Sequence, residues 1–277
     1  MPGAKRQPTG PPPPPTVQRL RLRYAKRGPL RFSSHRDIGR ALERALRRAA
    51  VPMAYSAGFS PHPKVSYLGA APTGVASEAE YVELGVAVRL DPERVRAALD
   101  DSLPPGLDVL EVVEAVPGLG GLPERIDASR WEVRLPGVSP AALAQAVEAF
   151  LATDIVEVER RTKDGRRTVD ARAAVTEARV ADNASPEGDG AVCAILQMVV
   201  RHVTPAVRPD DVLAGLRRAG ALEPPVPPTA TRLEQGLLGA DGRIADPLAA
   251  DREAVPTAGA PDRTTQDGGV AGSVPAP

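Results

Sequence analysis

VQRLRLRYAKRGPLRFSSHRDIGRALERALRRA, residues 17–49, contains a strand pattern followed directly by a helix pattern. From Val17 to Tyr24 apolar and basic residues alternate, and this period of two predicts a strand with one buried face. Ser34 and Asp37 are spaced as in a capping box, which marks the start of a helix. The apolar residues that follow recur at helical spacing: Ile38, Ala41, Leu42, Ala45, Leu46 and Ala49. The stretch therefore predicts a strand followed by an amphipathic helix.

Working outward, the rest of the first half continues this alternation of strands and helices. Predicted strands cover residues 65–68, 80–90 and 107–116, and a helix runs from Asp91 to about Leu103. The second half repeats the order, with strands at 131–135 and 191–202, helices at 139–153 and 209–218, and a hairpin of 155–161 with 167–171. We therefore predict an α+β fold of two tandem ferredoxin-like (β-α-β-β-α-β) units with antiparallel sheets.

Composition sets the expected domain boundaries. Residues 1–15 are proline-rich and 240–277 lack apolar periodicity, so both ends are predicted to be disordered. Between them, the first unit is expected at 16–118 and the second at 130–239. Residues 119–129 form the expected linker.

Several classes of protein are excluded or disfavoured by composition. Lys and Arg number 35 and Asp and Glu number 35, so the net charge is zero. Cys193 is the only cysteine, which excludes an internal disulfide and a multi-cysteine iron–sulfur or zinc site. No apolar run reaches 18 residues and the N-terminus has no signal-like apolar region, so we expect no membrane association and a cytoplasmic location. We expect no metal or other cofactor.

Basic residues are concentrated near the start of the chain. Residues 16–50 hold eleven Lys and Arg against Asp37 and Glu43. The helix arginines of this patch are Arg36, Arg40, Arg44, Arg47 and Arg48, and the strand arginines are Arg19, Arg21 and Arg23. Such a patch predicts contact with RNA phosphates. The alternative is a solvated helix face, neutralised by acidic residues between Glu78 and Glu114.

Two short segments are candidates for an anion site. Arg31, Ser33, His35 and Arg36 surround the helix start, where free backbone N–H groups favour an anion. The loop from residue 55 to 64 adds Tyr55, Ser60, His62 and Lys64, with prolines on both sides of His62. We expect the chain to fold back so that His62 and Lys64 lie beside His35 and Arg31 in one cleft. His35 and His62 are the candidate catalytic residues; the alternative is that Ser34 and Asp37 only cap the helix.

The series RFSSHRD (31–37), ALERALRR (41–48), YSAGFSPHPK (55–64), PTG (72–74) and SEAEY (77–81) resembles the radical-SAM-associated family of bacterial proteins. This resemblance covers roughly residues 17–235, with VDAR (169–172) and TRL (231–233) as weaker matches. It implies a stand-alone partner of a radical SAM protein or of RNA-processing machinery. A radical SAM enzyme holds its cluster with three cysteines, so this chain is not itself that enzyme.

These observations favour a non-catalytic RNA- or substrate-binding accessory protein. One alternative is a metal-independent endoribonuclease, for which His35, Tyr55, His62 and Lys64 are the candidate groups. Another is a protein–protein adaptor that uses the acidic face between Glu78 and Glu114.

Overall fold

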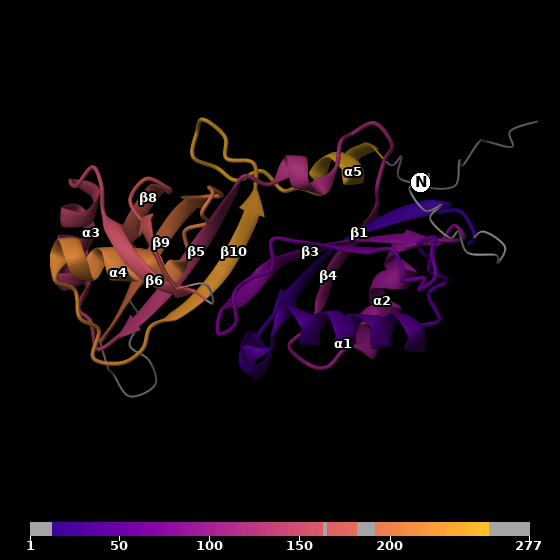
Figure 1. Cartoon of the computed structure of the whole chain (residues 1–277), viewed down its shortest axis with the longest axis horizontal. Helices are drawn as coiled ribbons and strands as arrows, with labels where there is room; N and C mark the ends of the chain where they lie inside the picture. Colours follow the sequence, from indigo (N-terminus) through magenta and orange to yellow (C-terminus); the bar gives the residue numbers. More distant parts are fainter. Residues whose placement is uncertain (1–12, 163–164, 182–191, 255–277) are drawn as a thin grey trace, which may run out of the picture.

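The computed structural model describes residues 13–162, 165–181 and 192–254, and Figure 1 shows two sheet-and-helix halves side by side. The strands are β1 (Gln18–Lys26), β2 (Val65–Leu68), β3 (Ala76–Val86), β4 (Val109–Glu114), β5 (Ala128–Pro136), β6 (Glu157–Thr162), β7 (Gly165–Asp170), β8 (Val175–Val180), β9 (Cys193–Arg201) and β10 (Thr229–Gly236). The α-helices are α1 (His35–Arg48), α2 (Pro92–Ser102), α3 (Pro140–Leu151), α4 (Pro209–Gly220) and α5 (Ala249–Ala254). Two 3₁₀ helices are η1 (Gly28–Phe32) and η2 (Leu122–Arg125).

In the first half, the apolar face of β1 and β3 is covered by α1 and α2. β1 pairs with β3 and β4, β2 pairs with β3, and every pairing is antiparallel. Leu20 and Leu22 of β1 pack with Leu42 and Leu46 of α1 and Leu99 of α2, and all five are 5% exposed or less. Because side chains alternate along a strand, the arginines of β1 lie on the opposite face. Ser34 and Asp37 form the predicted capping box.

The second half has the same connectivity apart from an added hairpin. β5 pairs with β10 and β9, and β9 pairs with β8, all antiparallel. Helices α3 and α4 cover one face through Leu143, Phe150 and Leu216. The predicted hairpin is present as β6 and β7, which form a separate two-stranded sheet.

The two halves share one sheet. The described strands follow the order β4-β1-β3-β10-β5-β9-β8, with β2 also paired to β3. β3 is long enough to pair with β2 through residues 81–84 and with β10 through Ala76 and Ser77. The β3–β10 contact is parallel. The α+β class with mostly antiparallel strands is thus confirmed, but the sequence predicts two sheets and the structure joins them into one.

Strand β10 was not predicted because its sequence, TATRLEQG, lacks alternating apolar residues. β8 was not predicted either. Both strands are recognised only through their pairing with β5, β3 and β9.

The segment after residue 240 contradicts the prediction of a disordered tail as far as it is described. Residues up to 254 fold back along the junction and end in α5 (Figure 1). Leu248 and Asp251 are fully buried, and Leu248 packs with Tyr81, Val113 and Leu122. Leu122 belongs to the expected linker, which is therefore a packed connection. The buried apolar contacts of Leu248 and the buried ion pairs of Asp251 hold this segment in place, although its composition predicted disorder. Residues 255–277 and 1–12 of the predicted disordered ends lie outside the described residues.

Candidate functional site

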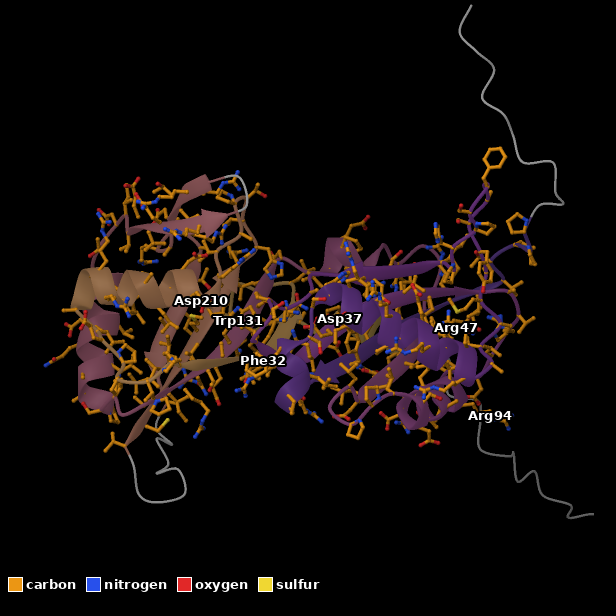
Figure 2. All side chains as sticks on the ribbon, turned by 60° about the horizontal axis from the view of Figure 1, so that its bottom comes forward. Phe32, Asp37, Arg47, Arg94, Trp131 and Asp210 are labelled. Carbon is orange, nitrogen blue, oxygen red and sulfur yellow. The ribbon has the colours of Figure 1, made fainter. Side chains whose placement is uncertain are left out.

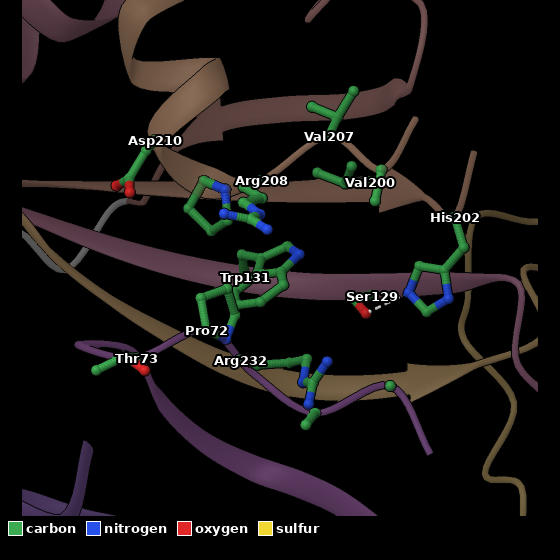
Figure 3. A pocket seen from close by; sticks show the side chains of 14 residues that line it. Pro72, Thr73, Ser129, Trp131, Val200, His202, Val207, Arg208, Asp210 and Arg232 are labelled. Carbon is green, nitrogen blue, oxygen red and sulfur yellow. Dashed lines mark hydrogen bonds between the residues drawn. The ribbon is translucent and has the colours of Figure 1, made fainter. Parts of the chain in front are cut away.

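A pocket of about 660 Å³ lies between the two halves (Figure 3). Its wall comes from the β2–β3 loop, from β5, β9 and β10, and from the loop that leads into α4. Its lining includes Ala70, Pro72, Thr73, Ser129, Trp131, Val200, His202, Arg208, Asp210 and Arg232. The pocket exists because β10 brings the second half against the β2–β3 loop of the first.

Trp131 and Arg232 form the floor of the pocket. They are paired in the register of β5 and β10, and the guanidinium of Arg232 lies 5.5 Å from the centre of the Trp131 ring. Arg232 is 3% exposed and forms a buried ion pair with Glu80 of β3. Its Nε also donates to Ser77 Oγ at 3.3 Å. Since Glu80 compensates this guanidinium, Arg232 joins the halves and leaves little free charge for a ligand.

The β2–β3 loop is held over the pocket by charged groups. Lys26 Nζ donates to the carbonyls of Pro72 and Ala71 at 3.1 and 3.3 Å, and Ala71 N–H donates to the second carboxylate oxygen of Glu80 at 3.2 Å. Burial lowers the pKa of Lys26, and the nearby Glu80 opposes that shift. Lys26 thus holds the β2–β3 loop in place and is not a surface charge, although it belongs to the predicted basic patch.

His202 and Ser129 supply paired polar atoms at one side of the pocket. His202 Nε2 lies 2.8 Å from Ser129 Oγ, as the dashed line in Figure 3 shows. Burial lowers the pKa of His202, Arg232 lowers it further and Asp127 opposes the shift. Because the ordinary value is about 6.5, the imidazole is neutral at pH 7. A neutral imidazole has one donor and one acceptor nitrogen, so Nε2 either donates to the Ser129 hydroxyl or accepts from it, according to the tautomer.

Arg208 and Asp210 form the exposed rim beside α4. Arg208 donates its backbone N–H to Asp211 at 2.8 Å, which caps the helix. Arg160 pairs with the same Asp211 carboxylate at 2.9 Å. The guanidinium of Arg208 makes no ion pair within the described ranges. The rim therefore presents the exposed guanidinium of Arg208 and the exposed carboxylate of Asp210, and neither forms an ion pair with another described residue.

The predicted basic patch is divided between two faces of the sheet. Arg19 and Arg21 of β1 pair with Glu83 at 2.7 and 3.0 Å, and Arg23 donates to the carbonyl of Glu78 at 2.8 Å. The α1 arginines lie in solvent on the other side. Their closest carboxylate contact is Arg40 to Asp37 at 3.9 Å. In the described part of the chain, Arg36, Arg44 and Arg47 make no ion pair.

The groups predicted around the start of α1 lie near one another but not around a cavity. His35 packs edge-on against Tyr67, with ring centres 5.0 Å apart. The guanidinium of Arg31 lies 4.7 Å from the Phe32 ring, and Ser33 donates its N–H to Leu30. Ser34 and Asp37 bond to each other at the helix start, and these hydrogen bonds lower the pKa of Asp37. The capping carboxylate therefore occupies the place expected for a bound anion.

The loop that carries the other candidates lies elsewhere. His62 and Lys64 line a separate pocket of about 270 Å³ with Arg19 and Glu83. Lys64 Nζ donates to Thr16 Oγ1 at 2.9 Å, and Ser56 and His62 bond to each other across the loop. Tyr55 is 41% exposed, and Ser60 is also exposed.

The predicted composite cleft is wrong. His35 contacts Tyr67, which points to α1 and approaches the carbonyl of Gly39 at 3.5 Å. His62 precedes Tyr67 by five residues of nearly extended chain, about 16 Å. It also opens to the opposite face, with Glu83 and Arg19. The chain folds back after Pro52 as expected, but the following strand separates the two histidines.

With this geometry established, comparison with known proteins gives a family. A model of an uncharacterized protein conserved in bacteria (DUF2344) matches residues 19–209, well over half of the chain. The chain belongs to this family. The DUF2344 match includes Trp131, His202 and Arg208 of the junction pocket, and it ends before β10 and Arg232. No curated protein matches the chain.

Solved structures add no argument to the DUF2344 membership. One is DypB in complex with manganese, which is 12% identical, with 76% of this chain and 87% of that chain covered and a TM-score of 0.21. Another is DyPB from Rhodococcus jostii RHA1, also 12% identical, with 74% and 84% covered and a TM-score of 0.18. TM-scores this low support no inference about fold or activity.

Sequence reasoning missed the junction pocket because its residues come from distant parts of the chain. Trp131 was visible as the only tryptophan on a predicted strand, and His202 as a histidine at the end of another. Neither pattern indicates that they share a pocket with Arg232, which lies on an unpredicted strand. Across the described residues, no group of three or more His, Cys, Asp or Glu is placed to hold a metal ion. No described helix is both long and apolar enough to cross a bilayer.

Proposed function

We propose that this protein is a non-catalytic RNA-binding accessory protein that works with a radical SAM enzyme or with RNA-processing machinery. The observation that carries the proposal is the exposed arginine stripe of α1, defined as Arg36, Arg40, Arg44 and Arg47. Steps of four, four and three residues keep these side chains on one side of the helix over about 16 Å. A row of exposed guanidinium groups, of which Arg40 alone has a carboxylate of the described residues within 4.0 Å, fits successive phosphates of a nucleic acid backbone.

Exposed aromatic side chains support a single strand as the ligand. Phe32, just before α1, is 61% exposed, and Phe59 and Tyr55 in the following loop are 72% and 41% exposed. Two of the three phenylalanines of the chain are therefore in solvent. Unpaired bases stack on such rings, whereas a duplex keeps its bases inside. Figure 2 shows Phe32 beyond the Asp37 end of α1, with Arg47 at the other end.

The separation of His35 from His62 supports binding without cleavage. Metal-independent RNA cleavage needs an acid and a base on both sides of one phosphate. In the structure His35 packs on Tyr67, while His62 opens to the opposite face of the sheet. The RNA-cleaving alternative and the adaptor alternative have no comparable observation in their favour. The proposed partner rests on the resemblance to radical-SAM-associated proteins.

We further propose that each half is a ferredoxin-like unit. The orders β4-β1-β3-β2 and β10-β5-β9-β8, with helices on one face in each half, support it. In this arrangement the first unit presents α1, and the shared sheet holds it beside the junction pocket.

A charge-reversal experiment tests RNA binding. Arg44→Glu with Arg47→Glu should weaken retention of a single-stranded RNA oligonucleotide on a filter by at least tenfold. It should also reduce the dependence of log affinity on log salt by about 0.7 for each lost phosphate contact. The matched control is Arg217→Glu with Arg218→Glu, which makes the same change in the last turn of α4. Equal RNA affinity of the two double variants would mean that the stripe is only a solvated helix face. Shortened RNA after incubation with the protein would contradict the non-catalytic assignment.

A further inference from the structure

We propose that the junction pocket binds one unstacked nucleotide of the RNA strand that lies along α1. Its base would enter toward Trp131 and its phosphate would contact Arg208. This inference rests on the proposed function, and it adds a second site with its own ligand chemistry.

Pocket size fits a ligand of this class. Small-molecule sites enclose roughly 300–1,000 Å³, and the junction pocket encloses about 660 Å³. The apolar part of the wall is formed by Trp131, Val200 and Pro72. Trp131 is 6% exposed and Val200 2%, so a planar base would contact the exposed edge of the indole and pack against Pro72, which replace part of the stacking that it has lost.

The charges of the pocket place the phosphate at the rim. Arg232 is compensated by Glu80, so the floor offers no free cation. Arg208 is exposed and its guanidinium is uncompensated in the part of the chain described. Asp210 repels a phosphate, but its carboxylate accepts hydrogen bonds from hydroxyl groups. In Figure 3 Arg208 lies above Trp131, with Asp210 farther along the same edge. The phosphate therefore belongs at Arg208 and the ribose hydroxyls toward Asp210.

Paired polar atoms at the side of the pocket suit the edge of a base. The neutral imidazole of His202 contacts Ser129 Oγ through Nε2, and the two side chains form one polar side of the pocket. The Thr73 hydroxyl, on the opposite loop, is a second donor or acceptor. Nucleobases carry both kinds of group along their edges, and RNA-binding proteins read them when the base is unstacked.

Position links the pocket to the arginine stripe. The β2–β3 loop, which lines the pocket through Pro72 and Thr73, donates Gly74 N–H to the carbonyl of Arg31 at 2.7 Å. Phe32 follows Arg31 directly, and in Figure 2 it lies at the end of α1 that is nearer the second half. A strand that follows α1 toward its N-terminus therefore passes Phe32 and reaches the mouth of the pocket.

Trp131 makes the inference directly measurable, because it is the only tryptophan of the chain. Its fluorescence in the full-length protein is titrated with AMP, GMP, CMP and UMP, and then with the corresponding nucleosides. We expect a saturable change with at least one monophosphate, and affinity at least tenfold weaker for its nucleoside. Arg208→Gln should abolish that difference, while Arg218→Gln, the same change on α4 outside the pocket, should preserve it.

A second variant tests the cavity without changing charge. Ala70 is exposed at the pocket wall, and Ala70→Phe fills the space in front of Trp131. It should abolish the monophosphate response and weaken binding of a single-stranded RNA about tenfold, with an unchanged thermal midpoint. No saturable response to any monophosphate, or the same response in Arg208→Gln and Ala70→Phe as in the parent protein, overturns the inference.

The two proposals fail in different ways. If the α1 double variant loses RNA while the pocket variants keep full RNA affinity, the pocket inference is wrong and the proposed function stands. If the α1 double variant keeps its RNA affinity, the proposed function is wrong. The monophosphate titration then still reports on the pocket, because it does not involve α1.

Discussion

The arginines of β1 and the arginines of α1 are neighbours in sequence but have opposite environments. Arg21 of β1 is 4% exposed and contacts Glu83, Asp251 and the carbonyl of Gly120. Arg44 and Arg47 of α1 are exposed, with no ion pair in the described ranges. The first set holds distant segments together, whereas the second leaves its charge available to a ligand.

The comparison shows that a count of charges does not predict a binding surface. Residues 16–50 contain many more basic than acidic residues. Because side chains alternate along a strand, however, the β1 arginines lie on the face of the sheet that α5 and η2 approach. The helical repeat of 3.6 residues places the α1 arginines on the side of the helix that faces solvent. Acidic partners from β3 and α5 then neutralise only the strand set.

Removing Asp251 should cause the largest loss of stability. Its carboxylate accepts from Arg21 and Arg125, both at 2.6 Å, and from Val116 N–H at 3.0 Å. Asp251→Ala removes the carboxylate that pairs with the largely buried Arg125 and leaves the buried Arg21 with Glu83 alone, so the free energy of unfolding should fall by about 3 kcal/mol. Urea unfolding measures it, with Asp241→Ala on the surface as the control. A loss below about 1 kcal/mol would show that α5 does not stabilise the junction.

Acid should remove part of the same stabilisation. Burial alone raises the pKa of Asp251, but hydrogen bonds from Arg125, Val116 and Arg21 outweigh it and hold the pKa below its ordinary value. The unfolded chain therefore takes up this proton first as pH falls below about 4. Stability contributed by Asp251 is present above that pH and is lost as pH falls through the lower folded value. Unfolding in urea at several pH values should show a shallower acid loss for Asp251→Asn; parallel curves would contradict this assignment.

Loss of the α1 cap should have an intermediate effect. Ser34 Oγ accepts from Asp37 N–H at 3.2 Å, which satisfies one of the free donors of the first turn. Ser34→Ala should lower the free energy of unfolding by about 1 kcal/mol. Ser34→Thr, which keeps the hydroxyl, is the control in the same denaturation experiment. Equal losses for the two variants would mean that the hydroxyl does not cap α1.

The smallest stability effect is expected for the α1 arginines themselves. Arg44→Ala should change the free energy of unfolding by less than about 0.5 kcal/mol, because the side chain is exposed and has no ion pair among described residues. The same substitution should still weaken RNA retention. A stability loss comparable to that of Asp251→Ala would mean that both arginine sets are structural.

Prediction from sequence succeeded where the pattern is local. The strand from Val17, the capping box at Ser34 and Asp37, and the helix with Leu42 and Leu46 buried all appear as expected. The hairpin of β6 and β7 was also recognised, from its Asp-Gly turn. Errors fell on β10, on residues 240–254 and on the composite cleft. In each of these, the deciding contact is made by residues far apart in the chain.

The alternation of strands and helices can be predicted from the sequence, because each element buries one face and local periodicity indicates which face that is. The sequence also determined that residues 16–50 are strongly basic. Tertiary structure alone decided which of those arginines are neutralised, because Glu83 and Asp251 reach Arg21 only after β3 and α5 have packed. It also decided that Trp131, His202 and Arg208 share a pocket, since β5 and β9 must first pair and the β2–β3 loop must lie against them. Periodicity reports which face of an element is buried, whereas the partner on that face depends on long-range pairing that no local pattern contains.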